Sequence, residues 1–392
     1  MMIASISNKG TLMKHFFRAL IVFSVVFAAS FSACTDSSSD PDQKIKKIQK
    51  AAEQGDAQAQ CDLGSCYFGG IGVTQDYAEA VKWFRKAAEQ GHAESQFNLG
   101  FCYGTGQGIE LDEAEALIWY RKAADQGYAL AQYNLGYCYY HGVGVEPDDV
   151  KAADFWRKAA EQGFAEAEYN LGFCYATGKG VEQDGAEAVK WFRKAADQGD
   201  VEAAYNLGLC YFNGEGVEQD KAEAMKLFRK AADQGFALAQ NDLGTSYSTG
   251  NGVEQDHVEA VKWYRMAVEQ GFPDAENNLG KCYYHGHGVE EDHAEAVKWF
   301  RKAAEQGYAL AQYNLGQCYY QGDGVEQDGA EAVKWFRKAA EQGDAEAQYN
   351  LATCYFNGMG IEQDKAEAAK WYRMAAEQGD ESAKQALKEL GL

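Results

Sequence analysis

The cysteines are the residues whose type and spacing most clearly suggest chemistry. Eight of the 10 recur at one position of a 36-residue period, with Ser246 where a ninth would stand: Cys66, Cys102, Cys138, Cys174, Cys210, Cys282, Cys318 and Cys354. Equivalent positions on neighbouring helices lie about 8–10 Å apart, whereas a disulfide needs Cα atoms within about 7 Å. We therefore expect small buried packing residues, with a redox or metal role as the less favoured alternative.

Other catalytic or ligand-binding patterns are weak. His285, His287 and His293 could bind a metal ion adventitiously, but histidines in loops are usually just solvated, so we expect no metal site and no cofactor. The sequence has no P-loop and no dinucleotide-binding glycine motif, because its glycines follow helices. Downstream of residue 33 it also has no Ser-x-x-Lys. The sequence thus favours a protein that is not an enzyme.

Charge and composition exclude further classes. The 392 residues include 37 Lys and Arg against 59 Asp and Glu, which gives a net charge of −22. This balance argues against a nucleic-acid-binding protein, whose affinity rests on basic groups that displace counterions from phosphates. The 46% of hydrophobic and 13% of aromatic residues are ample for a large core and too many for a disordered chain.

The N-terminus has the pattern of an export signal. Lys14 and Arg18 precede an apolar run, residues 19–29, that is short for a bilayer core of about 30 Å. The sequence Phe-Ser-Ala-Cys that ends at Cys34 resembles the bacterial lipobox, which implies cleavage before Cys34 and its lipidation. Thr35, by the same resemblance, implies the outer membrane. The alternatives are a simple exported protein, periplasmic or secreted, and an uncleaved anchor.

These assignments define the first two segments of the chain. Residues 1–33 are a signal peptide, and the start is at Met1 or Met13. Residues 34–43 are polar and rich in serine, so we expect a flexible tether. Loss of residues 1–33 removes three positive charges and takes the net charge to −25.

Most of the remaining chain is one period repeated without insertion or deletion. Ten glycines are each separated by 36 residues, and nine units run between them from Asp56 to Gly379: Gly55, Gly91, Gly127, Gly163, Gly199, Gly235, Gly271, Gly307, Gly343 and Gly379. A period of this length indicates stacked supersecondary units, so length does not predict two or three separate globular domains here.

One unit shows the expected architecture. In the ninth unit, residues 345–357 have apolar side chains at helical spacing, and a Gly-x-Gly turn ends this first helix. Asp364 begins a second helix, and Glu367 completes a capping box. The Asp recurs in all nine units and the Glu in eight, Lys151 being the exception. Each unit is a helix–turn–helix that cannot bury its apolar face alone.

The consensus of the nine units is the pattern L-G-x-C-Y-x-x-G-x-G-V-x-x-D-x-x-E-A-x-K-W-[FY]-R-K-A-A-x-Q-G. This pattern resembles the Sel-1-like repeat, a relative of the tetratricopeptide repeat. The periodicity predicts an all-α solenoid of nine 36-residue repeats, residues 56–379. The resemblance further implies an α/α right-handed superhelix whose first helices line the concave side. We expect residues 44–55 and 380–392 to be capping helices with polar outer faces.

An aromatic strip is the candidate site for a partner. On a helical wheel, Tyr133, Tyr137 and Tyr140 lie opposite the core face of the third unit. The strip is apolar in units two to five and broken in units six and seven. Its middle position varies most along the array, so we expect exposure and partner binding there, at Phe101, Tyr137, Phe173 and Leu209. Packing against neighbouring helices is the favoured role of the first aromatic of each unit.

An amide row runs beside this strip. Its members in units three to five are Asn134, Asn170 and Asn206, and Asp62 and Asp242 stand at equivalent positions. Such side chains could bond an extended peptide backbone or, equally well, the neighbouring helix.

The sequence thus predicts a monomeric, non-catalytic scaffold of the bacterial cell envelope. It would bind a protein or peptide in its concave groove and contact the membrane only through a lipid anchor, because members of the resembled family commonly act as adaptors. Two alternatives stay open. One is a protein that binds or hydrolyses cell-wall peptides or β-lactams, and the other is an exported effector that contacts a host protein.

Overall fold

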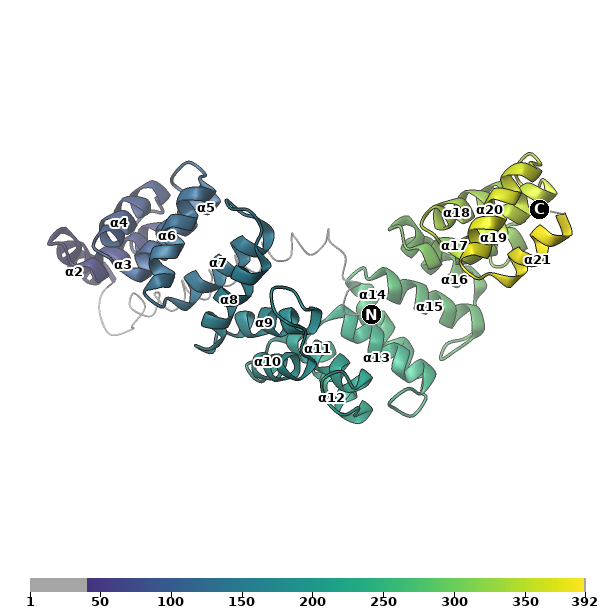
Figure 1. Ribbon diagram of the computed structural model, residues 1–392, viewed down its shortest axis with the longest axis horizontal. Coiled ribbons are helices and arrows are strands. Elements are labelled where there is room, and N and C mark those ends of the chain that lie inside the picture. Colours follow the sequence, from purple (N-terminus) through teal and green to yellow (C-terminus); the bar gives the residue numbers. More distant parts are fainter. Residues whose placement is uncertain (1–40, 391–392) are drawn as a thin grey trace. The chain divides into compact units, whose positions relative to one another are not determined.

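The computed structural model describes residues 41–390, and within this range every regular element is a helix (Figure 1). The prediction of an all-α solenoid built from nine helix–turn–helix repeats is confirmed. The helices are α2 (Pro41–Glu53), α3 (Ala57–Gly69), α4 (Tyr77–Glu89), α5 (Ala93–Thr105), α6 (Glu113–Asp125), α7 (Ala129–His141), α8 (Asp149–Ala160), α9 (Ala165–Thr177), α10 (Gly185–Asp197), α11 (Val201–Asn213), α12 (Lys221–Asp233), α13 (Ala237–Thr249), α14 (His257–Glu269), α15 (Pro273–His285), α16 (His293–Glu305), α17 (Ala309–Gln321), α18 (Gly329–Glu341), α19 (Ala345–Asn357), α20 (Lys365–Glu377) and α21 (Glu381–Leu390).

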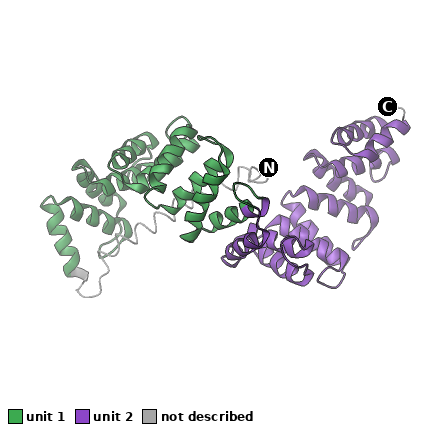
Figure 2. Ribbon diagram, turned by 60° about the horizontal axis from the view of Figure 1, so that its bottom comes forward, with its two compact units in different colours: residues 1–210, 214–218 green, residues 211–213, 219–392 purple. Residues whose placement is uncertain are grey.

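The helices form two compact units (Figure 2). Of the described residues, unit 1 comprises 41–210 and 214–218, and unit 2 comprises 211–213 and 219–390. Within these units, successive helices pack against each other from α2 to α10 and from α12 to α21, for example α3 on α4 and α4 on α5. Helix α2 covers α3, and α21 covers α20. Helix α2 begins at Pro41, three residues before the expected start of the N-terminal cap. Residues 1–33 and Cys34 lie outside the described residues.

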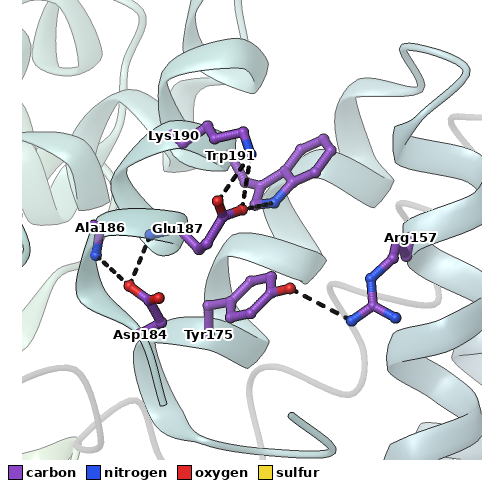
Figure 3. A network of polar contacts seen from close by, with 7 residues as sticks. All are labelled: Arg157, Tyr175, Asp184, Ala186, Glu187, Lys190 and Trp191. Atoms are coloured by element: carbon purple, nitrogen blue, oxygen red, sulfur yellow. Dashed lines mark hydrogen bonds and ion pairs between the residues drawn. The ribbon is translucent and has the colours of Figure 1, made fainter. Parts of the chain in front are cut away.

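Capping residues fix where each helix begins and ends. Asp184 begins α10 by accepting hydrogen bonds from the backbone N–H groups of Ala186 and Glu187, at 2.9 and 3.1 Å (Figure 3). Glu187 accepts bonds from Lys190 and from the indole N–H of Trp191. First helices end at a glycine in the left-handed region, such as Gly178 with φ +73°. The predicted Asp cap at the start of the second helix is confirmed in all nine repeats. The expected reciprocal bond of a capping box is wrong, because the backbone N–H of each capping Asp donates to a tyrosine carbonyl of the first helix, as that of Asp184 does to Tyr175 at 3.0 Å.

Repeats one to eight have a glycine after the leucine of the first helix, where the ninth repeat has Ala352. The ring of Phe84 in α4 lies so near Gly64 in α3 that a Cβ there would stand 2.6 Å from the ring. Gly172 faces Phe192 and Gly316 faces Phe336 in the same way, and all three rings are fully buried. Close packing of this kind is sensitive to a single added methyl group. The glycine of the Leu-Gly pair is therefore a packing residue and not a hinge.

Two side-chain ladders join neighbouring repeats. In the first, an arginine of a second helix donates to the tyrosine hydroxyl 18 residues later, as Arg85 does to Tyr103 at 2.7 Å. The weaker bond from Arg157 to Tyr175, at 3.4 Å, lies beside the Asp184 cap (Figure 3). These bonds tie the second helix of one repeat to the first helix of the next.

The second ladder is built of buried glutamines, and it was not predicted. Gln132 donates to the carbonyl of Ala124, eight residues earlier, at 3.2 Å, and accepts from Gln162 in the turn after α8 at 2.7 Å. The same pair of bonds occurs at Gln60, Gln96, Gln240, Gln312 and Gln348. The sequence signal was present, because a glutamine precedes the closing glycine of every repeat. Glu168 and Glu276 replace the buried glutamine in repeats four and seven.

The nine cysteines within the described residues are free and buried, which confirms the expected packing role. Burial raises the pKa of the Cys102 and Cys138 thiols to about 12 and of Cys354 to about 11. Because the thiolate is the reactive form, these side chains are unreactive near neutral pH.

Candidate partner-binding face

The expected exposure of the middle strip position is wrong for two of the four residues. Phe101 and Leu209 are only 7% and 9% exposed. Phe101 packs edge-on against Phe68 of the preceding first helix, with ring centroids 6.3 Å apart. Tyr137 and Phe173 are half-buried and keep part of their rings at the surface. The wheel placed all four on one helix side correctly, but the neighbouring first helix covers much of that side.

The side chains at the first and third strip positions both pack against neighbouring helices, but they are buried to different extents. Tyr133 is buried, and its ring lies 5.1 Å from that of Phe164 at the start of the next first helix. This confirms the packing role favoured for the first aromatic. Tyr140 is half-buried and packs against Trp156 of α8, with ring centroids 5.3 Å apart. Its hydroxyl accepts a bond of 3.0 Å from Lys179 in the turn after α9.

The amide row is used largely inside the protein. Asn98 is buried and bonds the Cys61 thiol of the preceding first helix at 3.8 Å, and the buried Asn206 donates to the carbonyl of Glu202. Asn134 is half-buried within hydrogen-bonding reach of the Tyr120 hydroxyl. Asn170 is also half-buried. These amides therefore bond within the protein, which is the second of the two roles expected for the amide row.

We define the first-helix face of unit 1 as the residues at three helical positions, i, i+4 and i+7, of α3, α5, α7, α9 and α11. These residues are Gln58, Asp62, Ser65; Glu94, Asn98, Phe101; Leu130, Asn134, Tyr137; Glu166, Asn170, Phe173; and Glu202, Asn206, Leu209. Contacts between α3 and α5 show that neighbouring first helices lie side by side here. The face combines partly exposed aromatic rings with carboxylates.

In repeats six and seven of unit 2, polar side chains stand at the middle position of the strip. Thr245 and Lys281 are exposed at the middle position. Asn241 and Asn277 replace the first aromatic, and each accepts a bond from an asparagine of the next first helix, Asn278 at 3.0 Å and Asn314 at 2.8 Å. At the middle position of the strip, apolar side chains therefore occur only in unit 1.

Four of the seven histidines gather in one part of unit 2. The rings of His257 and His287 stack at 4.7 Å, and His293 stacks on Tyr284 at 4.5 Å. Burial, followed by the charges of His287 and Lys281, lowers the pKa of His285. No group of three or more potential ligands is placed to hold a metal ion anywhere in residues 41–390. In the same range, no helix has the length and apolar character needed to cross a membrane.

Comparisons with known proteins agree with this architecture. A family model described as Sel1 repeat matches nine consecutive segments, residues 57–92, 93–128, 129–164, 165–200, 201–236, 237–272, 273–308, 309–344 and 345–380. A protective antigen of uropathogenic Escherichia coli strains, c5321, which displays an SLR fold, is 39% identical; the match covers 93% of this chain and 78% of that chain, with a TM-score of 0.81. A Sel1 repeat protein from Oxalobacter formigenes is 36% identical over 79% of this chain and 89% of that chain, with a TM-score of 0.64. A search of curated proteins gives no match.

Stacked helix–turn–helix units joined by side-chain ladders define an all-helical repeat protein. The chain belongs to the Sel1 repeat family. Folds of this kind commonly mediate protein–protein interactions, and the family is generally one of non-enzymatic scaffolds.

Proposed function

We propose that this protein is a non-catalytic scaffold that binds a protein or peptide partner on the first-helix face of unit 1, as the inner face of the solenoid. One observation carries the proposal: Tyr137 and Phe173, at equivalent positions of the adjacent first helices α7 and α9, keep part of their aromatic surface exposed. Equivalent positions are about 8–10 Å apart, so the two rings can contact one bound segment. Aromatic side chains of this kind dominate binding energy at protein interfaces.

The double variant Tyr137→Ser/Phe173→Ser tests this function. Loss of both rings is expected to weaken partner capture at least tenfold, because burying one aromatic side chain contributes about 1.5–3 kcal/mol. The measurement is quantitative capture from an envelope extract on the immobilised chain. Phe101 and Leu209 are left unchanged, since their replacement would open the core.

A matched control separates the face from apolar surface in general. Ile118→Ser/Val150→Ser removes two side chains that are 49% and 59% exposed on the second helices α6 and α8 of the same unit. This control should capture the partner as well as the unchanged chain does, and both double variants should keep their helical circular-dichroism spectrum. Equal capture by the two double variants would refute the assignment of this face.

We further propose that the chain is an exported lipoprotein, with Cys34 as the lipidated residue after removal of residues 1–33. The support is the signal-like sequence, which lies outside the described residues. The family relative in Escherichia coli is a protective antigen, which is consistent with an envelope location.

Labelled palmitate tests the anchor. The full chain, expressed in a bacterial host that processes lipoproteins, should incorporate the label, and Cys34→Ser should abolish incorporation completely. The buried repeat cysteines cannot substitute, because they are enclosed by the fold. Incorporation that survives Cys34→Ser, or its absence from the unchanged chain, would exclude the lipoprotein form.

A further inference from the structure

The charges of unit 1 are divided between its two sets of helices. The five first helices α3, α5, α7, α9 and α11 contain no lysine and no arginine. The second helices carry several each, and these cations are used locally. Lys82 pairs with Glu79 at 2.6 Å, while Lys86 and Lys122 lie 3.8 and 3.7 Å from the ring centroids of Trp83 and Trp119. The first-helix face thus takes its charge from carboxylates.

Those carboxylates lie on the same side as the aromatic rings. Glu94, Glu166 and Glu202 each stand seven residues before the middle strip position of their helix and are half-buried. Asp62 is half-buried on α3, where burial and the negative charge of Glu94 raise its pKa. An acidic residue near a helix N-terminus is favourable by itself, but Leu130 and Gln58 at the equivalent position show that the fold does not require it.

On this face, the distance between the carboxylates and the aromatic rings matches the width of an α-helix. Seven residues of α-helix span about 10.5 Å, and an α-helix with its side chains is about 10–12 Å across. A helical segment that lies across the first helices, with its apolar side on Tyr137 and Phe173, would place one flank beside the carboxylates. Basic side chains on that flank would be attracted to the carboxylates of the face, whereas acidic side chains there would be repelled by them.

We propose that the partner of the first-helix face of unit 1 is a cationic amphipathic helix, with apolar side chains on Tyr137 and Phe173 and lysine or arginine beside Glu94, Glu166 and Glu202. This inference rests on the proposed function, because it names the class of partner for the same face. Lys179, which contacts Tyr140 at the C-terminal end of the first helices, sets the other edge of the face. The basic flank of the partner therefore points toward the helix N-termini.

Two synthetic helical peptides test the charge. Both have 22 residues and the same apolar stripe, but the polar positions are lysine in one and glutamate in the other. Fluorescence anisotropy with the chain that begins at residue 34 should show binding of the lysine peptide at 150 mM NaCl, weaker binding at 500 mM, and no binding of the glutamate peptide. Equal binding of the two peptides would overturn the proposal.

Attraction of the lysine peptide to the three glutamates of the face must be distinguished from attraction to the net negative charge of the whole chain, which is strongly acidic. The triple variant Glu94→Gln/Glu166→Gln/Glu202→Gln should weaken binding of the lysine peptide about tenfold. A matched triple with the same change in net charge, Glu146→Gln/Glu182→Gln/Glu218→Gln, alters exposed turn residues of unit 1 and should change binding less than twofold. Equal effects of the two triples would assign the binding to general attraction and refute the site.

The same variants distinguish failure of this inference from failure of the proposed function. If Tyr137→Ser/Phe173→Ser releases the captured native partner but the face triple does not, the aromatic face stands and the cationic partner is wrong. If neither releases it, both are wrong. Release by both supports both.

Discussion

Gly180→Ala is expected to lower the free energy of unfolding by about 3 kcal/mol or more, against about 1 kcal/mol for Gly163→Ala. Both glycines have φ in the left-handed region, +71° and +82°. A Cβ on Gly180, however, would stand 2.0 Å from the carbonyl oxygen of Asp149 at the start of α8, whereas a Cβ on Gly163 meets nothing within 4 Å. The alanine at 180 must push apart the backbones of two repeats, in addition to the strain of its φ.

Comparison of these two variants therefore separates the destabilisation due to the contact between repeats from that due to backbone strain. Urea denaturation followed by circular dichroism gives the two stabilities, and hydrogen exchange should show the loss in repeats three and four first, because solenoid repeats are stabilised by their neighbours. Similar losses for both variants would show that the turn glycine is kept for its φ alone. The same close approach recurs at Gly216, Gly288, Gly324 and Gly360.

The repeat architecture could be predicted from the sequence because each of its signals is local. A capping Asp, a C-terminal glycine and apolar residues at helical spacing depend on neighbours within one or two turns, and nine copies of each remove ambiguity. Asp76 and Gly70 take the conformations that their types favour. The second Gly of each turn was placed in the turn correctly, but its contact with the preceding repeat could not be seen, since that contact joins residues about 31 apart.

The candidate site was harder to predict for the same reason. A helical wheel gives the direction of a side chain but not how far the next helix covers it. Phe101 and Tyr137 occupy one repeat position, yet Phe101 packs against Phe68 and is buried while Tyr137 is only half-buried. The difference depends on whether the preceding repeat has an aromatic ring that packs against this position, as Phe68 does against Phe101. Exposure within a strip is thus a property of pairs of repeats, which a single-repeat pattern does not contain.

The glutamine ladder shows which repeats depart from the common design. Gln132 can donate to the carbonyl of Ala124 and accept from Gln162 at once, because an amide carries both groups. Glu168, only 3% exposed, keeps the bond from Gln198 at 2.8 Å but, when ionised, has no proton for the equivalent carbonyl of Ala160. Burial raises the pKa of Glu168. Repeat four therefore holds a buried carboxylate where six repeats hold an amide.

Glu168→Gln is expected to stabilise unit 1 by about 1–2 kcal/mol at pH 7, since it restores the missing bond and removes a buried charge. The raised pKa fixes how this gain depends on pH. The ionised carboxylate costs more free energy in the folded than in the unfolded chain, so the cost is present at neutral pH. It shrinks as the pH falls through the raised pKa of the folded chain and is gone below about 4.3, the pKa of an unfolded glutamate. The advantage of the variant over the unchanged chain, measured by urea denaturation, should shrink from pH 7 to pH 4.

Glu276→Gln is the control: Glu276 pairs with Lys302 at 2.8 Å and with Gln306 at 2.6 Å, so its replacement loses an ion pair and should gain little. A gain for Glu168→Gln that stayed constant with pH would show that packing, and not the buried charge, separates the two side chains.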